Sequence, residues 1–293
     1  MPIRSLIMLL CFALLAGCGS TNYEAQFEHS LTHLRNEEPF RSLWPEPITI
    51  RLPGEESNEV LQLRVPRLFD MQSGEAYALD KNTPDPRDPE EGVAPERLWP
   101  EFLQIGEHLR TYERTLNVNP PLEGENRVPV RCYIAVADEK TAGSFGDIEK
   151  TLEERFRRPA TAAADDDTKN PAGEEIKWKQ IDIRTPDGGD SLKAARGQED
   201  LALPQSWYEK LGKSKLKQKT LKSSCLIYLI PEGEKTVILA WLMPAGLAER
   251  ENIESPSQAP PPKQYPIARA MAGTVKILEP GSGPSSDSQA EPN

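Results

Sequence analysis

Few side chains in this sequence have the types and the spacing that catalysis or metal binding requires. His29 and His33 lie four residues apart, a spacing that would place both imidazoles on one side of a helix. A zinc site normally takes at least three protein ligands, and no third ligand accompanies this pair. We therefore interpret the two histidines as solvated side chains, and we expect neither a metal nor another cofactor.

The motifs of the common hydrolases are also missing. Ser214 and Lys217 match the Ser-x-x-Lys motif of penicillin-recognising enzymes, but the accompanying Ser-Asp-Asn and Lys-Thr-Gly motifs do not occur. The sequence has no Gly-x-Ser-x-Gly, no His-Glu-x-x-His and no phosphate-binding loop. His108, on the flank of an expected helix, is the one realistic base for a Ser-His-Asp arrangement. These observations favour a protein that is not an enzyme, although 46 acidic residues leave a carboxylate pair open.

The N-terminus has the pattern of a secretory signal. Arg4 supplies a positive charge, residues 5–14 are nearly all apolar, and Leu15-Ala16-Gly17-Cys18 ends the run with small residues and a cysteine. The apolar run is shorter than the about 20 residues that a membrane-spanning helix needs. The pattern predicts a signal peptide over residues 1–17 that is cleaved between Gly17 and Cys18.

Residues 15–18 resemble the lipobox of bacterial lipoproteins. The resemblance implies a diacylglycerol on the sulfur of Cys18, and usually a third acyl chain on its amine. Two or more acyl chains anchor a protein stably, so the resemblance implies a lipid-anchored protein that faces the periplasm. In the Gram-negative sorting rule, an aspartate after the cysteine retains a lipoprotein at the inner membrane. Gly19 at that position therefore favours the outer membrane.

Two more cysteines remain in the mature chain, Cys132 and Cys225, and both fall in apolar runs typical of strands. An exported protein lies in a compartment that permits disulfides. A bridge needs α-carbons about 4.4–6.8 Å apart, which requires the two strands to be neighbours. The alternative is a pair of buried thiols that act as small apolar residues. The sequence leaves both possibilities open because it fixes neither strand order nor register.

The overall charge limits the possible partners. The chain has 293 residues and a formal net charge of −11. Nucleic-acid binding needs clustered Lys and Arg to contact phosphates, so an acidic chain argues against it. We expect two partners instead, which are the membrane, reached through the lipid anchor, and an unidentified protein or polymer of the envelope.

Apolar periodicity predicts both strands and helices. Alternating residues indicate strands at 48–65, 128–136, 176–183 and 225–243, the first and last being hairpins. Apolar residues spaced three and four apart indicate helices at 22–35, 101–116, 145–157 and 267–275. Both arms of the hairpin at 225–243 are apolar on both faces, which is typical of central strands that are covered on both sides.

These elements predict an α+β fold, with a mostly antiparallel sheet covered by helices in a single domain. The proposed division is a signal peptide at 1–17, a lipidated tether at 18–45, a globular domain at 46–278 and a disordered tail at 279–293. Proline-rich and acidic stretches without apolar rhythm indicate flexible insertions near 80–95 and 159–175.

The order of elements resembles the PsbP-like fold family. The resemblance rests on Ile48–Val65, Cys225–Met243 and Ile267–Ile277, and the two insertions depart from a compact family member. The family is largely non-catalytic and acts through binding, but the resemblance carries over no functional residue. We therefore expect a membrane-anchored envelope lipoprotein with a non-catalytic binding or scaffold domain. The alternative is an envelope hydrolase that uses a carboxylate pair.

Overall fold

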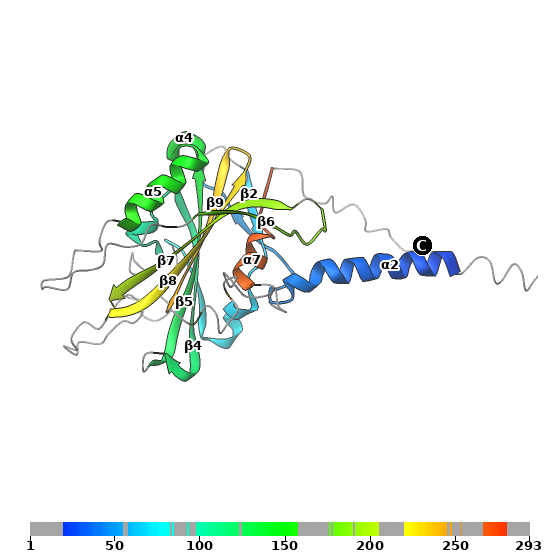
Figure 1. Cartoon of the computed structure of the whole chain (residues 1–293), viewed down its shortest axis with the longest axis horizontal. Helices are drawn as coiled ribbons and strands as arrows, with labels where there is room; N and C mark the ends of the chain where they lie inside the picture. The colour runs from blue at the N-terminus through cyan, green and yellow to red at the C-terminus, as the bar shows by residue number, and fades with distance from the viewer. Residues whose placement is uncertain are drawn as a thin grey trace, which may run out of the picture.

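The computed structural model contains two antiparallel sheets and a few helices, which confirms the predicted α+β class (Figure 1). The structure describes residues 20–54, 58–82, 84, 93, 98–122, 125–157, 176, 178–189, 191–204, 220–244, 247, 253 and 266–279. The insertion predicted at 159–175, nearly all of the tail at 279–293 and most of the insertion at 80–95 lie outside these residues, so those predictions stay open.

A seven-stranded sheet forms the centre of the molecule, in the order β3-β4-β5-β9-β8-β7-β6 with every neighbouring pair antiparallel. Its strands are β3 Ala76–Leu79, β4 Glu107–Leu122, β5 Glu125–Asp138, β6 Lys179–Ile183, β7 Leu192–Pro204, β8 Thr220–Glu232 and β9 Lys235–Pro244. The predicted hairpin at 225–243 is confirmed as β8–β9, and β9 is the middle strand. Every residue of β9 after Lys235 is buried, as expected for a strand covered on both faces.

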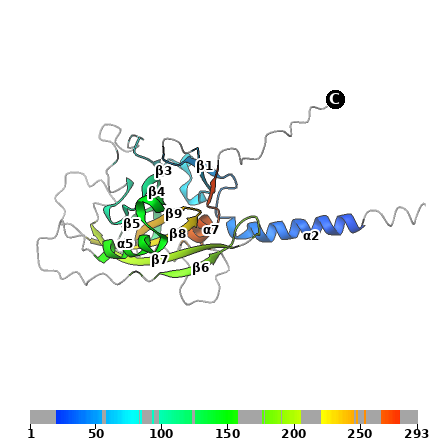
Figure 2. The same cartoon turned by 90° about the horizontal axis from the view of Figure 1, so that it is seen from above.

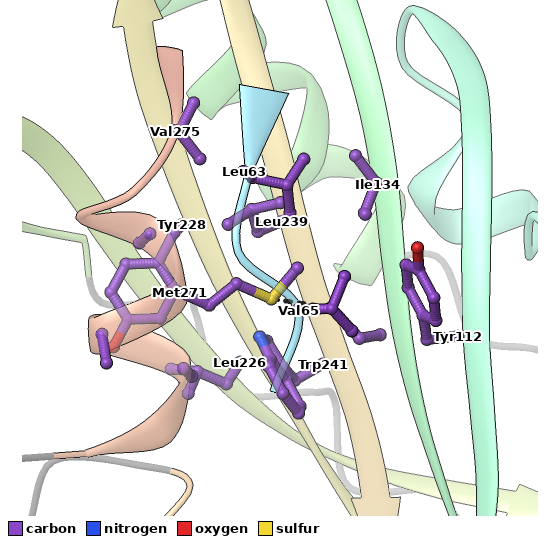
Figure 3. Packing of buried hydrophobic residues seen from close by; sticks show 14 of the residues in the cluster. Leu63, Val65, Tyr112, Ile134, Leu226, Tyr228, Leu239, Trp241, Met271 and Val275 are labelled. Carbon is purple, nitrogen blue, oxygen red and sulfur yellow. Dashed lines mark hydrogen bonds between the residues drawn. The ribbon is translucent and has the colours of Figure 1, made fainter. Parts of the chain in front are cut away.

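One face of this sheet packs against a second, three-stranded sheet of order β1-β2-β10. The elements of this layer are β1 Ile48–Arg51, β2 Val60–Leu63, β10 Lys276–Leu278, α7 Ile267–Ala272 and the short turns η1 Glu38–Phe40, η2 Arg67–Phe69 and η3 Met71–Ser73. Figure 3 shows Trp241 and Leu239 of β9 close to Met271 of α7 and Leu63 of β2. We expected helices to cover this face, but a sheet forms most of the cover. The helix expected over 267–275 ends at Ala272.

The opposite face carries α4 (Glu139–Ala142) and α5 (Phe145–Arg157). The predicted helix at 145–157 is confirmed, and Ile148, Leu152 and Phe156 pack onto the sheet. Before its first turn, the backbone N–H of Ser144 donates to Asp147 Oδ2 at 3.0 Å, as a capping interaction requires. Hydrogen bonds from Ser144 lower the pKa of Asp147, because they stabilise the charged carboxylate.

The helix predicted over 101–116 is wrong. Residues 101–103 form one short turn, η4, and β4 occupies Glu107–Leu122. The spacing of Leu109, Tyr112 and Leu116 resembles that of a helix, but strand pairing with the long β5 decides the conformation. Glu113 also obscured the strand pattern, since it is a charged residue that the sheet buries completely.

The helix expected near the N-terminus is present as α2, Ser20–Glu37, and it projects away from the sheets (Figures 1 and 2). Its described contacts with the body lie at its C-terminal end. Glu37 Oε2 pairs with Arg64 Nη1 of the segment after β2 at 2.8 Å, and Asn36 packs against Gly188. No helix in the described part of the chain is long and apolar enough to cross a membrane.

Candidate functional site

The predicted lipid-attachment site lies just before the described chain. Gly17 and Cys18 are outside the described residues, as are Ser214 and Lys217, so these predictions remain untested. The structure does place the start of α2 at Ser20, two residues after Cys18. Any lipid on Cys18 would therefore be joined to the body almost directly through this helix.

Cys132 and Cys225 do not form a disulfide. Cys132 of β5 lies opposite Trp241 of β9, and Cys225 of β8 lies opposite the next residue of β9, Leu242. Consecutive residues of a strand point to opposite faces of the sheet, so the two cysteines do as well. Cys132 accordingly lies in the core on the small-sheet side, 3.8 Å from Met271, whereas Cys225 lies in the core under α5. The hypothesis of a bridge is therefore wrong, and both cysteines are buried as small apolar residues. Burial raises the pKa of the Cys132 thiol well above its ordinary value.

The histidines do not converge on one site. His29 and His33 are both exposed on α2, and the residues that the structure describes contain no cluster of three metal-ligating side chains. His108, which the sequence placed on a helix flank, lies near the start of β4.

A groove with a volume of about 680 Å³ lies where β4 begins and β5 ends, beside α4, α5 and the β8–β9 hairpin. One of its lining residues is Gly106, which has φ = +72°. A side chain there would place a Cβ only 2.3 Å from the carbonyl oxygen of Val136. Glycine therefore allows the chain to enter β4 in close contact with β5, and this contact shapes the groove.

Both signs of charge line the groove, through Glu107, Asp138, Arg155 and Lys235. Three of these groups also hold the fold together. Arg155 Nη1 donates to the carbonyl oxygens of Gln104 and Glu101 at 2.7 and 3.2 Å, and Lys235 forms an ion pair with Glu59. Asp138 Oδ1 accepts from the backbone N–H of Lys140 at 2.8 Å and so caps α4. The groove is suited to a polar occupant that carries little net charge.

A row of buried polar side chains lies on the face of the seven-stranded sheet that α5 covers. We call it the β4–β5 polar cluster, and it consists of Thr111, Glu113, Arg131 and Tyr133. Arg131 Nε donates to Glu113 Oε2 at 2.6 Å, and neither side chain is exposed. Burial raises the pKa of Tyr133 to about 12, so the phenol stays protonated. The cluster holds a complete ion pair inside the core and offers no accessible carboxylate.

His108 contacts the β4–β5 polar cluster through Thr111. The Thr111 hydroxyl donates to the carbonyl oxygen of Leu98 at 2.5 Å, and His108 Nε2 lies 2.8 Å from the same hydroxyl. The Trp99 ring stacks on the imidazole with centroids 5.8 Å apart. Burial lowers the pKa of His108 to about 4, so the imidazole is neutral at pH 7. A neutral, packed histidine has a structural role here.

Sequence reasoning missed both the groove and the polar cluster. The groove comes from the close approach of segments far apart in the chain, such as 104–107 and 151–155. The sequence holds one signal for the cluster, because Arg131 is a charged residue inside an apolar strand-like run and Glu113 supplies a charge of the opposite sign.

No protein-family model matches this sequence, and no curated protein matches it significantly. The resemblances to the lipobox and to the PsbP-like family therefore stay predictions.

Proposed function

We propose that this chain is a lipid-anchored protein of the bacterial cell envelope, and that its folded body binds a partner without catalysing a reaction. The proposal starts from residues 15–18, whose pattern is that of a lipoprotein processing site. The strongest support is the way helix α2 connects Cys18 to the folded body. Helix α2 begins two residues after Cys18 and ends in the contacts of Asn36 and Glu37 with the body. This arrangement suits an anchor that carries a folded domain on the periplasmic side, with Gly19 favouring the outer membrane.

The groove supports binding in preference to catalysis. Arg155 donates to a backbone carbonyl oxygen, Lys235 pairs with Glu59, and Asp138 caps helix α4. Groups held in this way can present fixed donors and acceptors to a partner, but they are poorly placed to exchange protons with a substrate. The mixture of charges suits a polar protein segment or an envelope polymer.

The anchor is tested by changing Cys18→Ser in the full chain. Wild-type protein should fractionate with membranes and incorporate labelled fatty acid, because the acyl chains supply the membrane affinity. The variant should be released or should accumulate as uncleaved precursor. A wild-type protein that takes up no fatty acid would contradict the proposal.

Binding at the groove is tested by photo-crosslinking in intact cells. A photoreactive residue at Thr141, which is exposed at the groove, should capture one recurring envelope partner. The matched control is Thr49, which is exposed on β1 in the small sheet. Equal capture from both positions, or capture from neither, would argue against the groove as the binding site.

A second function keeps one specific observation in its favour, because the carboxylates of Glu107 and Asp138 line the same groove. Two carboxylates across a cleft can act as acid and base in hydrolysis. The mature chain should be incubated with ester, phosphate and glycoside substrates. Turnover that disappears in both Glu107→Gln and Asp138→Asn would establish this hydrolase in place of the binding protein. Absence of turnover in the wild type removes it.

A further inference from the structure

Helix α2 presents a narrow apolar stripe to solvent. The side chains of Phe27 and Leu34 are 52% and 57% exposed, and Leu31, which lies between them in sequence, is partly exposed. At about 100° per residue, these three positions fall within roughly 60° of one another around the helix axis. A contiguous exposed stripe of this kind marks a contact surface more often than scattered single residues do.

The stripe points away from the body of the protein. The residues of α2 that hold the body are Asn36, against Gly188, and Glu37, paired with Arg64. Counted around the helix, the middle of these contacts lies roughly 140° from the middle of the stripe. Figures 1 and 2 show the same separation on a larger scale, since α2 extends well beyond the sheets in both views. A surface could therefore cover the stripe without touching the sheets.

Helix α2 would be more stable if another surface covered its apolar stripe. Most helical stability in proteins comes from packing of an apolar face and not from the intrinsic propensity of the helix. The contacts of α2 with the body that the structure describes, made by Asn36 and Glu37, lie in its last turn. The remaining turns gain stability when Phe27, Leu31 and Leu34 are removed from water.

The position of Cys18 indicates which surface this is. If Cys18 is acylated, as the proposed function holds, the first turn of α2 starts at the membrane, because only one residue lies between Cys18 and Ser20. We propose that α2 lies along the phospholipid surface that carries the anchor, with Phe27, Leu31 and Leu34 in the interface and the folded body on the water side.

The charges of α2 refine the kind of membrane contact. The exposed residues Glu28 and Arg35 have opposite signs and lie within roughly 20° of each other on one side of the stripe, so their charges offset and give no cationic face to attract anionic lipid. The acyl chains provide the affinity, and the stripe sets the orientation of the body. A second copy of the chain is the other conceivable occupant. The stripe spans three residues over two turns, which is short of the three to four heptads typical of a coiled coil.

The experiment uses the lipidated full chain in phosphatidylcholine vesicles, with one spin label at a time at positions 27, 29, 31, 33 and 34. Cys132 and Cys225 are 0% exposed and stay unlabelled, and Cys18 is blocked by its lipid. Labels at 27, 31 and 34 should be accessible to oxygen and shielded from a water-soluble nickel chelate. Labels at 29 and 33 should show the reverse, because His29 and His33 lie on the other side of the helix.

A matched pair of variants gives a second readout. Phe27→Asp with Leu34→Asp should abolish the oxygen preference of a label at position 31. His29→Asp with His33→Asp adds two negative charges on the opposite side and should leave that preference intact. Equal loss in both variants would overturn the proposal.

The remaining outcomes separate the two proposals. Equal nickel access at all five positions in an anchored protein means that α2 stands away from the bilayer, so this inference alone fails. Shielding of 27 and 34 from both reagents, with spin–spin coupling between molecules, means that a second copy covers the stripe and also overturns it. A wild-type chain without fatty acid removes the anchor and with it both proposals.

Discussion

The two faces of the seven-stranded sheet are built from alternate residues of the same strands, yet they differ in chemistry. On the small-sheet side, Tyr112, Cys132 and Trp241 lie in a cluster of buried apolar and aromatic residues. On the α5 side, the neighbouring residues Glu113 and Arg131 form a buried ion pair. Side chains alternate along a strand, so a shift of the β4–β5 pairing by one residue would turn every side chain of the shifted strand to the other face of the sheet.

The comparison indicates where binding or chemistry could occur. The small-sheet face is closed by β1, β2, β10 and α7, so its role is to supply core stability. The α5 face combines apolar packing with the polar cluster, and the groove opens at its end beside α4. The following predictions test this division of roles between the faces.

The largest effect is expected on the small-sheet face. Trp241→Ala removes a fully buried ring whose centroid lies 5.7 Å from that of the Phe69 ring. The loss should lower the free energy of unfolding by about 3–5 kcal/mol. Denaturant unfolding of the mature domain measures this loss. The control is Trp44→Ala, because Trp44 is 40% exposed and should matter much less. Similar losses in the two variants would contradict the assignment of this face as the main core.

A somewhat smaller loss is expected in the polar cluster. Glu113→Gln keeps the shape and a hydrogen-bond acceptor but leaves Arg131 without its buried counter-charge, which should reduce the free energy of unfolding by about 3 kcal/mol. In the double variant Glu113→Leu and Arg131→Met, apolar groups replace both charges, and stability should return close to that of the wild type. A double variant no more stable than Glu113→Gln would show that the pair itself is required.

The histidine beside the cluster should make stability sensitive to acid. His108 has a pKa of about 4 in the folded protein, below its ordinary 6.5, because burial disfavours the charged ring; Asp80 raises this pKa and Lys81 lowers it. The unfolded chain binds a proton between pH 6.5 and 4 while the folded chain does not, so unfolding becomes easier as the pH falls through this window.

His108→Gln should flatten that part of the pH profile, whereas His33→Gln, on exposed α2, should not. Thermal unfolding of the three proteins between pH 4 and 7 provides the measurement. Parallel profiles for the wild type and His108→Gln would show that other groups carry the acid sensitivity.

The smallest effect is expected at the rim of the groove. Lys81 and Glu107 are 3.6 Å apart, with side chains 71% and 50% exposed. Exposed pairs of this kind contribute about 0.2–1 kcal/mol, so Lys81→Ala should change stability by no more than that. A loss as large as that of Glu113→Gln would mean that the rim is structural, and it would weaken the case for a binding groove.

Several elements follow from the sequence because their signals are local. The β8–β9 hairpin is apolar on both faces, which identifies it as central before any partner strand is known. Helix α5 has its apolar stripe and its Ser144–Asp147 cap within one short segment. The pattern around Cys18 is local too, although its chemical consequence stays a prediction.

Tertiary structure alone decided the features that depend on register and distant pairing. Residues 101–116 have helix-like spacing, but β5 offers a long partner whose Arg131 neutralises Glu113. That pairing makes residues 107–122 a strand. The cysteines look equivalent in sequence, yet they pair with consecutive residues of β9 and so face opposite sides. A strand pattern states which residues alternate, and only the assembled sheet determines which face each set occupies.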